Sequence, residues 1–214
     1  MIPEMLKNLF FLIFVCLSTV KTTGAYNFTG LAGETIGSSP DPRISISDSR
    51  PVNDQRLDNL ANAFLNSFGL PDTARSGSLM RQILSELKAW NHSNLITSKA
   101  QYSIGVYYLL KSRYSEALNW LRLSSYLRDQ TKTEDELLAK CLYNMGVAYY
   151  AAGDYQRMAQ TTLRSLEIEK KLYGPDDPRL ISGFSSLVNA YLNLNDYDKA
   201  IDFGNTALNL ISKA

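Results

Sequence analysis

His92 and several clusters of acidic residues are the side chains of this 214-residue sequence whose types could support catalysis or bind a metal. His92 lies among polar residues and has neither a second histidine nor a nearby cysteine to complete a metal site or a nucleophile pair. We therefore interpret it as a helix-capping or surface histidine. With one histidine and two cysteines in the chain, a site built from several His and Cys ligands is excluded.

The acidic clusters are better explained as helix starts than as general acids or bases. Residues 134–136 and 176–177 each precede an apolar periodic segment, where negative charge meets the positive end of a helix dipole. The sequence has no glycine-rich phosphate loop and no Gly-x-Ser-x-Gly elbow. We expect no catalysis and no cofactor or metal. The formal charge of +1, without a basic block, also argues against nucleic-acid binding.

The amino terminus has the layout of a secretory signal peptide. Lys7 precedes a 12-residue apolar run over residues 9–20, which is followed by small and polar residues ending at Ala25. This run is too short to span a bilayer comfortably. We expect cleavage after Ala25 and an exported, extracytoplasmic protein, either periplasmic or secreted, without a stable membrane span. An uncleaved anchor or a buried first helix is the alternative. After cleavage only Cys141 remains, so we expect no intramolecular disulfide and a buried Cys141.

The segment between the signal and residue 95 divides into two parts. Residues 26–52 are rich in Gly, Pro, Ser and Thr without an apolar period, which predicts a flexible leader. Apolar residues then recur at three- and four-residue steps from Asp54 to Phe68 and again over residues 78–90. We predict a helical pair over residues 53–95, which is either a diverged first repeat or an amino-terminal cap.

From residue 96 onward the sequence repeats itself. A shift of 41 residues superposes Gly105 on Gly146, and a further shift of 42 superposes Tyr149 on Tyr191. Each unit is divided by a turn signal, at residues 111–113, 153–154 or 195–196. This pattern predicts an all-α solenoid of stacked antiparallel helix hairpins, three of them over residues 96–214.

Local signals mark the ends of these helices. Thr133 with Glu136 fits a capping box, Gly174 fits a helix stop, and Pro178 fits a first helical turn. Gly105 lies in the middle of a predicted helix, where glycine costs about 1 kcal/mol relative to alanine. A close approach of the partner helix explains its presence, and Ala117 is the small residue expected to face it.

These motifs resemble tetratricopeptide repeats. The resemblance rests on Tyr-x-x-Gly-x-x-Tyr at 102–108 and on Met-Gly-x-x-Tyr at 145–149 followed by Gly-Asp-Tyr at 153–155. The family's usual repeat has about 34 residues. The longer spacing here and the link Tyr-Gly-Pro-Asp-Asp-Pro at 173–178 resemble the kinesin-light-chain-like subgroup. The resemblance implies a right-handed superhelix, and the third repeat departs most, with Val188 in place of the glycine.

The resemblance also implies a concave binding face formed by the first helix of each hairpin. The residues it places there are Lys99, Tyr102, Val106, Lys140, Tyr143, Asn144, Val147, Tyr150, Ser185, Asn189 and Leu192. Tyrosine offers rigid contact area and asparagine can bond a peptide backbone, so this face suits a protein or peptide ligand. Whether Tyr102, Tyr143 and Tyr150 line the face or fill the inter-helix core stays open, whereas Tyr108, Tyr149 and Tyr191 are assigned to the core. Tyr102 and Tyr143 stand where a carboxylate clamp needs lysine, so such a clamp is not expected.

The sequence thus predicts an exported tetratricopeptide-repeat scaffold for protein or peptide binding. The alternative is the extracytoplasmic sensory or regulatory input module of a signalling protein, with the chain a fragment of a longer one. An enzyme that uses the array to hold substrate finds no supporting residues. The last hairpin has no polar capping helix after it, so we expect a partner, a second copy or further sequence to cover its apolar face.

Overall fold

The computed structural model describes residues 54–67, 73–89 and 92–213, and these fold entirely as helices and connecting turns. The prediction of an all-α helical repeat fold is confirmed. The predicted signal peptide, residues 1–25, and the predicted leader, residues 26–52, lie outside the described residues. No helix of the described part is both long enough and apolar enough to cross a membrane.

The helices follow the apolar periodicity of the sequence. Their bounds are α2 Asp54–Leu65, α3 Thr73–Ala89, α4 Asn94–Leu110, α5 Tyr114–Gln130, α6 Glu136–Ala151, α7 Tyr155–Tyr173, the 3-10 helix η1 Pro178–Leu180, α8 Ile181–Asn193 and α9 Tyr197–Lys213. Helix α3 begins five residues before the predicted start at Ser78. The apolar stripe missed this first turn because its residues are mostly small or polar.

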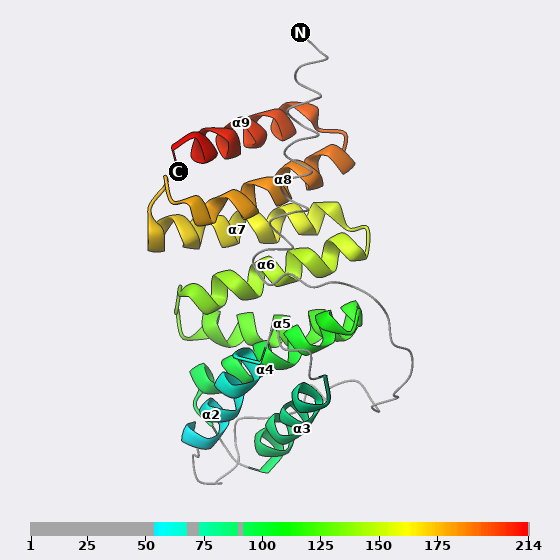
Figure 1. The fold of residues 1–214 in the computed structure, drawn as a ribbon, viewed down its shortest axis with the longest axis vertical. Helices are drawn as coiled ribbons and strands as arrows, with labels where there is room; N and C mark the ends of the chain where they lie inside the picture. The colour runs from blue at the N-terminus through cyan, green and yellow to red at the C-terminus, as the bar shows by residue number, and fades with distance from the viewer. Residues whose placement is uncertain (1–53, 68–72, 90–91, 214) are drawn as a thin grey trace. The chain divides into compact units, whose positions relative to one another are not determined.

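The chain divides into two compact units, whose described parts are residues 54–133 and residues 134–213. In the amino-terminal unit, α4 and α5 form an antiparallel hairpin, and α2 packs on both α3 and α4 (Figure 1). In the carboxyl-terminal unit, α6, α7, α8 and α9 follow one another as neighbouring antiparallel helices (Figure 1). Each unit has its own core of fully or nearly fully buried side chains, which include Leu57, Phe64, Met80, Ile83, Ile104 and Leu121 in the first and Leu138, Ile168, Leu180 and Leu187 in the second.

The three hairpin turns share one backbone geometry. Ser112, Gly153 and Asn195 occupy equivalent repeat positions, and all adopt a left-handed conformation with φ of 56°, 73° and 58°. In each hairpin the next residue's N–H donates to a tyrosine carbonyl five residues earlier, always at 2.9 Å. This 6→1 hydrogen bond closes the helix end as a Schellman motif. The structure therefore confirms the predicted turns and shows that they are copies of one motif.

Close helix approach explains the mid-helix glycines. A Cβ added to Gly105 would lie 2.7 Å from Cγ of Leu121, so Leu121 of α5, and not the predicted Ala117, is the residue that faces it. The prediction of Ala117 was wrong because the space that a glycine leaves can also be filled by a large side chain from the facing helix. At the equivalent Gly146, the added Cβ would lie 2.9 Å from Oγ1 of Thr162.

The helix ends show one further correction. The N-cap of α6 is Asp135, whose carboxylate accepts the Leu138 N–H at 3.0 Å, and not the predicted Thr133. Thr133 instead bonds to Thr131 within the preceding turn. The predictions for Gly174 and Pro178 are confirmed, since Gly174 ends α7 with φ of 93° and Pro178 opens η1.

Candidate protein-binding face

The solvent-exposed side of α6 carries two apolar side chains, although the exposed side of a helix is usually polar. Val147 is 37% exposed and Tyr150 is 45% exposed. The Tyr150 ring packs edge-on against the ring of Tyr155, with centroids 5.9 Å apart, which fixes its position while leaving much of it accessible. An exposed and already positioned aromatic ring suits protein recognition, because little side-chain entropy is lost on binding.

Polar side chains continue this side of α6. Lys140 is exposed and its Nζ lies 2.6 Å from a carboxylate oxygen of Glu136, one helical turn earlier. Tyr143 and Asn144 are half-buried between the apolar and polar parts of the helix. The side of α6 therefore runs from a charged end at Lys140 to an aromatic end at Tyr150.

Helix α8 presents amides at the equivalent repeat positions. Asn189, one repeat of 42 residues after Val147, is exposed, and its carbonyl and its Oδ1 both accept from the Asn193 side chain, at 2.8 and 2.9 Å. Leu192, equivalent to Tyr150, is half-buried, whereas Ser185 is buried. Equivalent positions of stacked repeats present the same face. We call the residues Lys140, Asn144, Val147, Tyr150, Asn189 and Asn193 the α6–α8 face.

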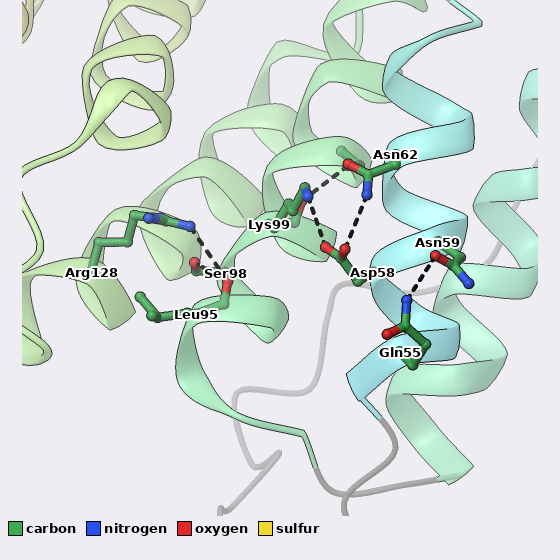
Figure 2. Close-up of polar contacts among 9 residues, drawn as sticks. Gln55, Asp58, Asn59, Asn62, Leu95, Ser98, Lys99 and Arg128 are labelled. Carbon is green, nitrogen blue, oxygen red and sulfur yellow. Dashed lines mark hydrogen bonds and ion pairs between the residues drawn. The ribbon is translucent and has the colours of Figure 1, made fainter.

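The three residues predicted in the amino-terminal unit are placed differently. Tyr102 is 7% exposed and Val106 is 2% exposed, so both side chains pack in the interior instead of lining an open surface. Lys99 is half-buried, and its Nζ donates to Oδ1 of Asp58 at 2.7 Å, which ties α4 to α2 (Figure 2). The structure therefore differs from the expected binding face at Tyr102 and Val106, which are buried in a unit where α2 packs on α4.

A cation lies over one tyrosine ring in each hairpin, which the sequence reasoning missed. The pairs are Arg113 over Tyr108 at 4.8 Å, Arg157 over Tyr149 at 5.0 Å and Lys199 over Tyr191 at 5.1 Å from the ring centroid. Tyr108 and Tyr149 are buried, in agreement with their predicted core role, and Tyr191 is half-buried.

Each of these cations also pairs with a carboxylate three residues away. The carboxylate comes before the cation in the second and third hairpins, whereas it comes after the cation in the first hairpin. Asp154 and Asp196 precede their helices and accept a backbone N–H three residues on, whereas Arg113 occupies the equivalent position without a side-chain cap. Hydrogen bonds from Arg157 lower the pKa of Asp154, and the hydrogen bond from Lys199 lowers the pKa of Asp196. The repeated spacing of residues 113, 154 and 196 was the signal that could have revealed this arrangement.

His92 is buried and was not expected to be. Its Nδ1 lies 3.5 Å from Oδ1 of Asp54, and its Nε2 lies 3.4 Å from the carbonyl oxygen of Glu86. Asp54 also accepts the Ser93 N–H at 2.9 Å, so this cluster fastens the start of α2 to the start of α4. Within the described ranges, no group of three His, Cys, Asp or Glu side chains could hold a metal ion.

Comparisons with known proteins agree with this architecture. A sequence profile of the tetratricopeptide repeat family matches residues 137–213. No curated protein sequence matches the chain significantly. Among solved structures, BtubC (BKLC) from P. vanneervenii superposes with a TM-score of 0.62 at 17% identity over 74% of this chain, which spans 62% of BtubC.

Two further structures show the same fold. The nearly identical TPR-like repeats of a putative kinesin light chain from Podosopora anserina give a TM-score of 0.64 at 15% identity, covering 76% of this chain and 78% of that one. MamA gives 0.55 at 18% identity, covering 76% of this chain and 81% of MamA. Residues 137–213 therefore match the tetratricopeptide repeat family, and the fold of the described residues is similar to that of kinesin-light-chain-like repeats.

Proposed function

We propose that this chain is an exported scaffold that binds a protein or peptide segment on the α6–α8 face. Tetratricopeptide repeats form a scaffold suited to protein–protein interaction, and the finer assignment rests on one observation. Tyr150 and Val147 stay exposed on α6, at 45% and 37%, although the repeat places several other aromatic rings in the interior. Exposed aromatic anchors beside side-chain amides are typical of surfaces that recognise polypeptide.

The chemistry of the face fits an extended or helical segment. The Tyr150 ring supplies contact area for an apolar side chain of the ligand, and the hydroxyl group can bond at its edge. Amides such as Asn144 and Asn189 can donate to and accept from a polypeptide backbone without selecting a charge. We therefore expect the face to recognise one or two apolar side chains and the backbone of the ligand. We do not expect the ligand to need an acidic or basic motif.

The first experiment is a crosslinking pull-down from the extracytoplasmic fraction, with the Tyr150→Ala variant compared against wild type. Tyr126→Ala is the matched control, since Tyr126 is 58% exposed but lies on α5 in the other unit. We expect Tyr150→Ala and Asn189→Ala to lower capture of a defined partner at least fivefold, with unchanged helical circular dichroism, while Tyr126→Ala does not. Equal capture by wild type and Tyr150→Ala would contradict the proposed face.

Export is supported by the signal-like amino-terminal sequence and needs its own test. We expect the mature protein in the extracytoplasmic fraction to begin at or near Tyr26 when its amino terminus is sequenced. Recovery of the uncleaved chain from the cytoplasm would contradict export.

A second candidate function is the sensory or regulatory input module of a signalling protein. The exposed Ile201 and Ile211 on α9 favour it, because a further segment of a longer chain would cover such side chains. It predicts an in-frame transmembrane and transmitter segment downstream in the coding sequence. A stop codon directly after Ala214 followed by an unrelated gene would count against it.

A further inference from the structure

We propose that the α6–α8 face binds its ligand as an extended chain whose backbone bonds to two asparagine side chains of α8. These are Asn189 and Asn193, which we call the α8 amide pair. Both residues are exposed, and they lie one helical turn apart on the same side of the helix. This rests on the proposed function of the face and specifies the form of polypeptide that it binds.

The surroundings of the α8 amide pair are uncharged. Helix α8 contains no Asp, Glu, Lys or Arg, although part of its surface is open to solvent. Its open side also carries Ser182, which is exposed, and Ser186, which is half-buried. Their hydroxyl groups donate to the backbone carbonyls of Arg179 and Ser182, at 3.3 and 2.9 Å. The side chains of α8 therefore offer a ligand neutral hydrogen-bonding groups and no ionic attraction.

The hydrogen bonds of Asn193 fix the orientation of both amides. One terminal atom of its side chain lies 2.8 Å from the backbone carbonyl oxygen of Asn189, and only a donor can bond there, so this atom is Nδ2. The same Nδ2 lies 2.9 Å from the Asn189 side chain, so the atom that it meets there is the acceptor Oδ1. Because a backbone carbonyl only accepts, neither amide can be inverted without losing a bond.

Each amide then has one group left for a ligand. Asn189 keeps Nδ2 with its two N–H groups, and Asn193 keeps Oδ1 as an acceptor. Neither atom has a hydrogen-bond partner among the residues that the structure describes. The α8 amide pair thus presents a donor and an acceptor on neighbouring turns. Since both are already oriented, little side-chain freedom is lost on binding.

An extended chain is the form of polypeptide that matches this arrangement. Each of its residues other than proline has a free C=O, which can accept from Nδ2 of Asn189, and a free N–H, which can donate to Oδ1 of Asn193. In a helix these groups bond within the helix, except for four at each end. The α8 amide pair can therefore bind the middle of an extended ligand, but only the ends of a helical one.

The α8 amide pair has no counterpart on α6. Val147 is equivalent to Asn189 and Ala151 to Asn193, and neither side chain can form a hydrogen bond. Helix α6 instead offers the exposed apolar surface of Val147 and Tyr150. An extended ligand on both helices would thus place an apolar side chain on α6 and its backbone against α8.

The test uses peptides of about twelve residues, selected from a random library by binding to the immobilised full chain. Fluorescence anisotropy measures the affinity of a selected peptide for each variant, and circular dichroism checks that helicity is unchanged. We expect Tyr150→Ala to weaken binding at least fivefold, which reports on the face itself. We expect Asn189→Asp to weaken it at least tenfold, because a carboxylate oxygen replaces the donor and repels the ligand carbonyl. Asn205→Asp, at an exposed asparagine of α9, is the matched control and should bind as wild type.

A double-mutant cycle tests whether Asn193 positions Asn189. Asn193→Ala removes an acceptor and also releases the Asn189 amide, so it should weaken binding at least threefold more in the wild-type background than in Asn189→Ala. Equal effects in the two backgrounds would contradict the orientation of one amide by the other.

Two measurements on the peptide test the bond to its backbone. An ester in place of one peptide bond weakens the carbonyl as an acceptor, and at one position it should weaken binding to wild type but not to Asn189→Ala. Carbon chemical shifts of the bound, labelled peptide should be those of an extended backbone. An ester effect of the same size in both proteins, or helical shifts, would overturn the inference.

Different results contradict this inference and the proposed face. If Tyr150→Ala weakens binding but Asn189→Asp does not, the backbone contact on α8 is overturned and the face remains supported. If Tyr150→Ala binds the selected peptides as wild type does, or if no peptide is selected, the proposed face is contradicted and this inference with it.

Discussion

Replacing Gly105 with alanine should destabilise the amino-terminal unit, although alanine is the better helix former. The added Cβ would lie 2.7 Å from Cγ and 2.8 Å from Cδ2 of Leu121, and 3.3 Å from its backbone nitrogen. Carbon atoms in contact prefer about 3.5 to 4.0 Å, so the two helices or the leucine must move by about 1 Å. Leu121 is fully buried, and because protein interiors are close-packed it has little room to move.

Two opposing contributions set the magnitude. Overpacking of a closed core costs about 1 to 3 kcal/mol, and alanine regains about 1 kcal/mol of helix propensity. Gly77 in α3 supplies the control, because a Cβ there would meet nothing closer than the Tyr107 hydroxyl at 3.7 Å. Gly77→Ala should therefore stabilise by about 0.5 to 1 kcal/mol, and the free energies of unfolding of the two variants should differ by about 1 to 3 kcal/mol.

Urea unfolding followed by tryptophan fluorescence measures this difference in the relevant unit. Both tryptophans, Trp90 and Trp120, precede residue 134 in the sequence, so residues 134–213 contribute no tryptophan signal. Leu121→Ala should also lower the free energy of unfolding less in the Gly105→Ala background than in wild type. The reason is that the truncated side chain no longer overlaps with the added Cβ. If Gly105→Ala and Gly77→Ala stabilise equally, the close approach of α4 and α5 is refuted.

Three further predictions concern charge. Exchanging Arg113 and Glu116 for Asp and Arg gives the first hairpin the cap that the other two have, and should raise the midpoint of urea unfolding, with a gain of about 1 kcal/mol. Hydrogen bonds from the Arg179 side chain and backbone lower the pKa of Asp177 from 3.8 to about 2. The associated stabilisation is complete above pH 3.8 and disappears as the pH falls toward 2. An NMR titration should find the Asp177 pKa raised in Arg179→Ala, and an unchanged titration would contradict the pairing. Lys99→Met removes the ion pair with α2 and should cost about 0.5 to 1 kcal/mol by the same fluorescence assay, whereas no loss would show that the pair contributes no net stability.

The repeat pattern allowed much of the fold to be predicted from the sequence. Turns at residues 153–154 and 195–196 are visible because Gly153 and Asn195 tolerate a left-handed backbone, and the turn at 111–113 is visible because Ser112 occupies the equivalent repeat position. Helix partners were harder to predict. Gly105 indicated a close approach, but which α5 residue fills the space depends on the rotation of that helix, and local sequence does not encode it.

In the candidate site too, features set by one helix could be predicted from the sequence, whereas features set by contacts between distant segments could not. Tyr150 and Val147 fall on the exposed side of α6 because helical periodicity within one hairpin determines it. Tyr102 and Val106 occupy the repeat positions of Tyr143 and Val147 yet are buried in the amino-terminal unit, where α2 packs on α4. Contacts such as Lys99 with Asp58 and His92 with Asp54 join residues about 40 positions apart, beyond the reach of pattern analysis.

The most direct test of the central claim is site-specific photocrosslinking from the α6–α8 face. A photoreactive amino acid is placed at Val147 on α6 and, in a second variant, at Asn189 on α8, with Leu172 on α7 as the control position. Binding on this face predicts that the same partner crosslinks from both Val147 and Asn189, and that Leu172 yields at least fivefold less. Crosslinks that appear from Leu172 alone, or different products from Val147 and Asn189, would contradict a shared binding face.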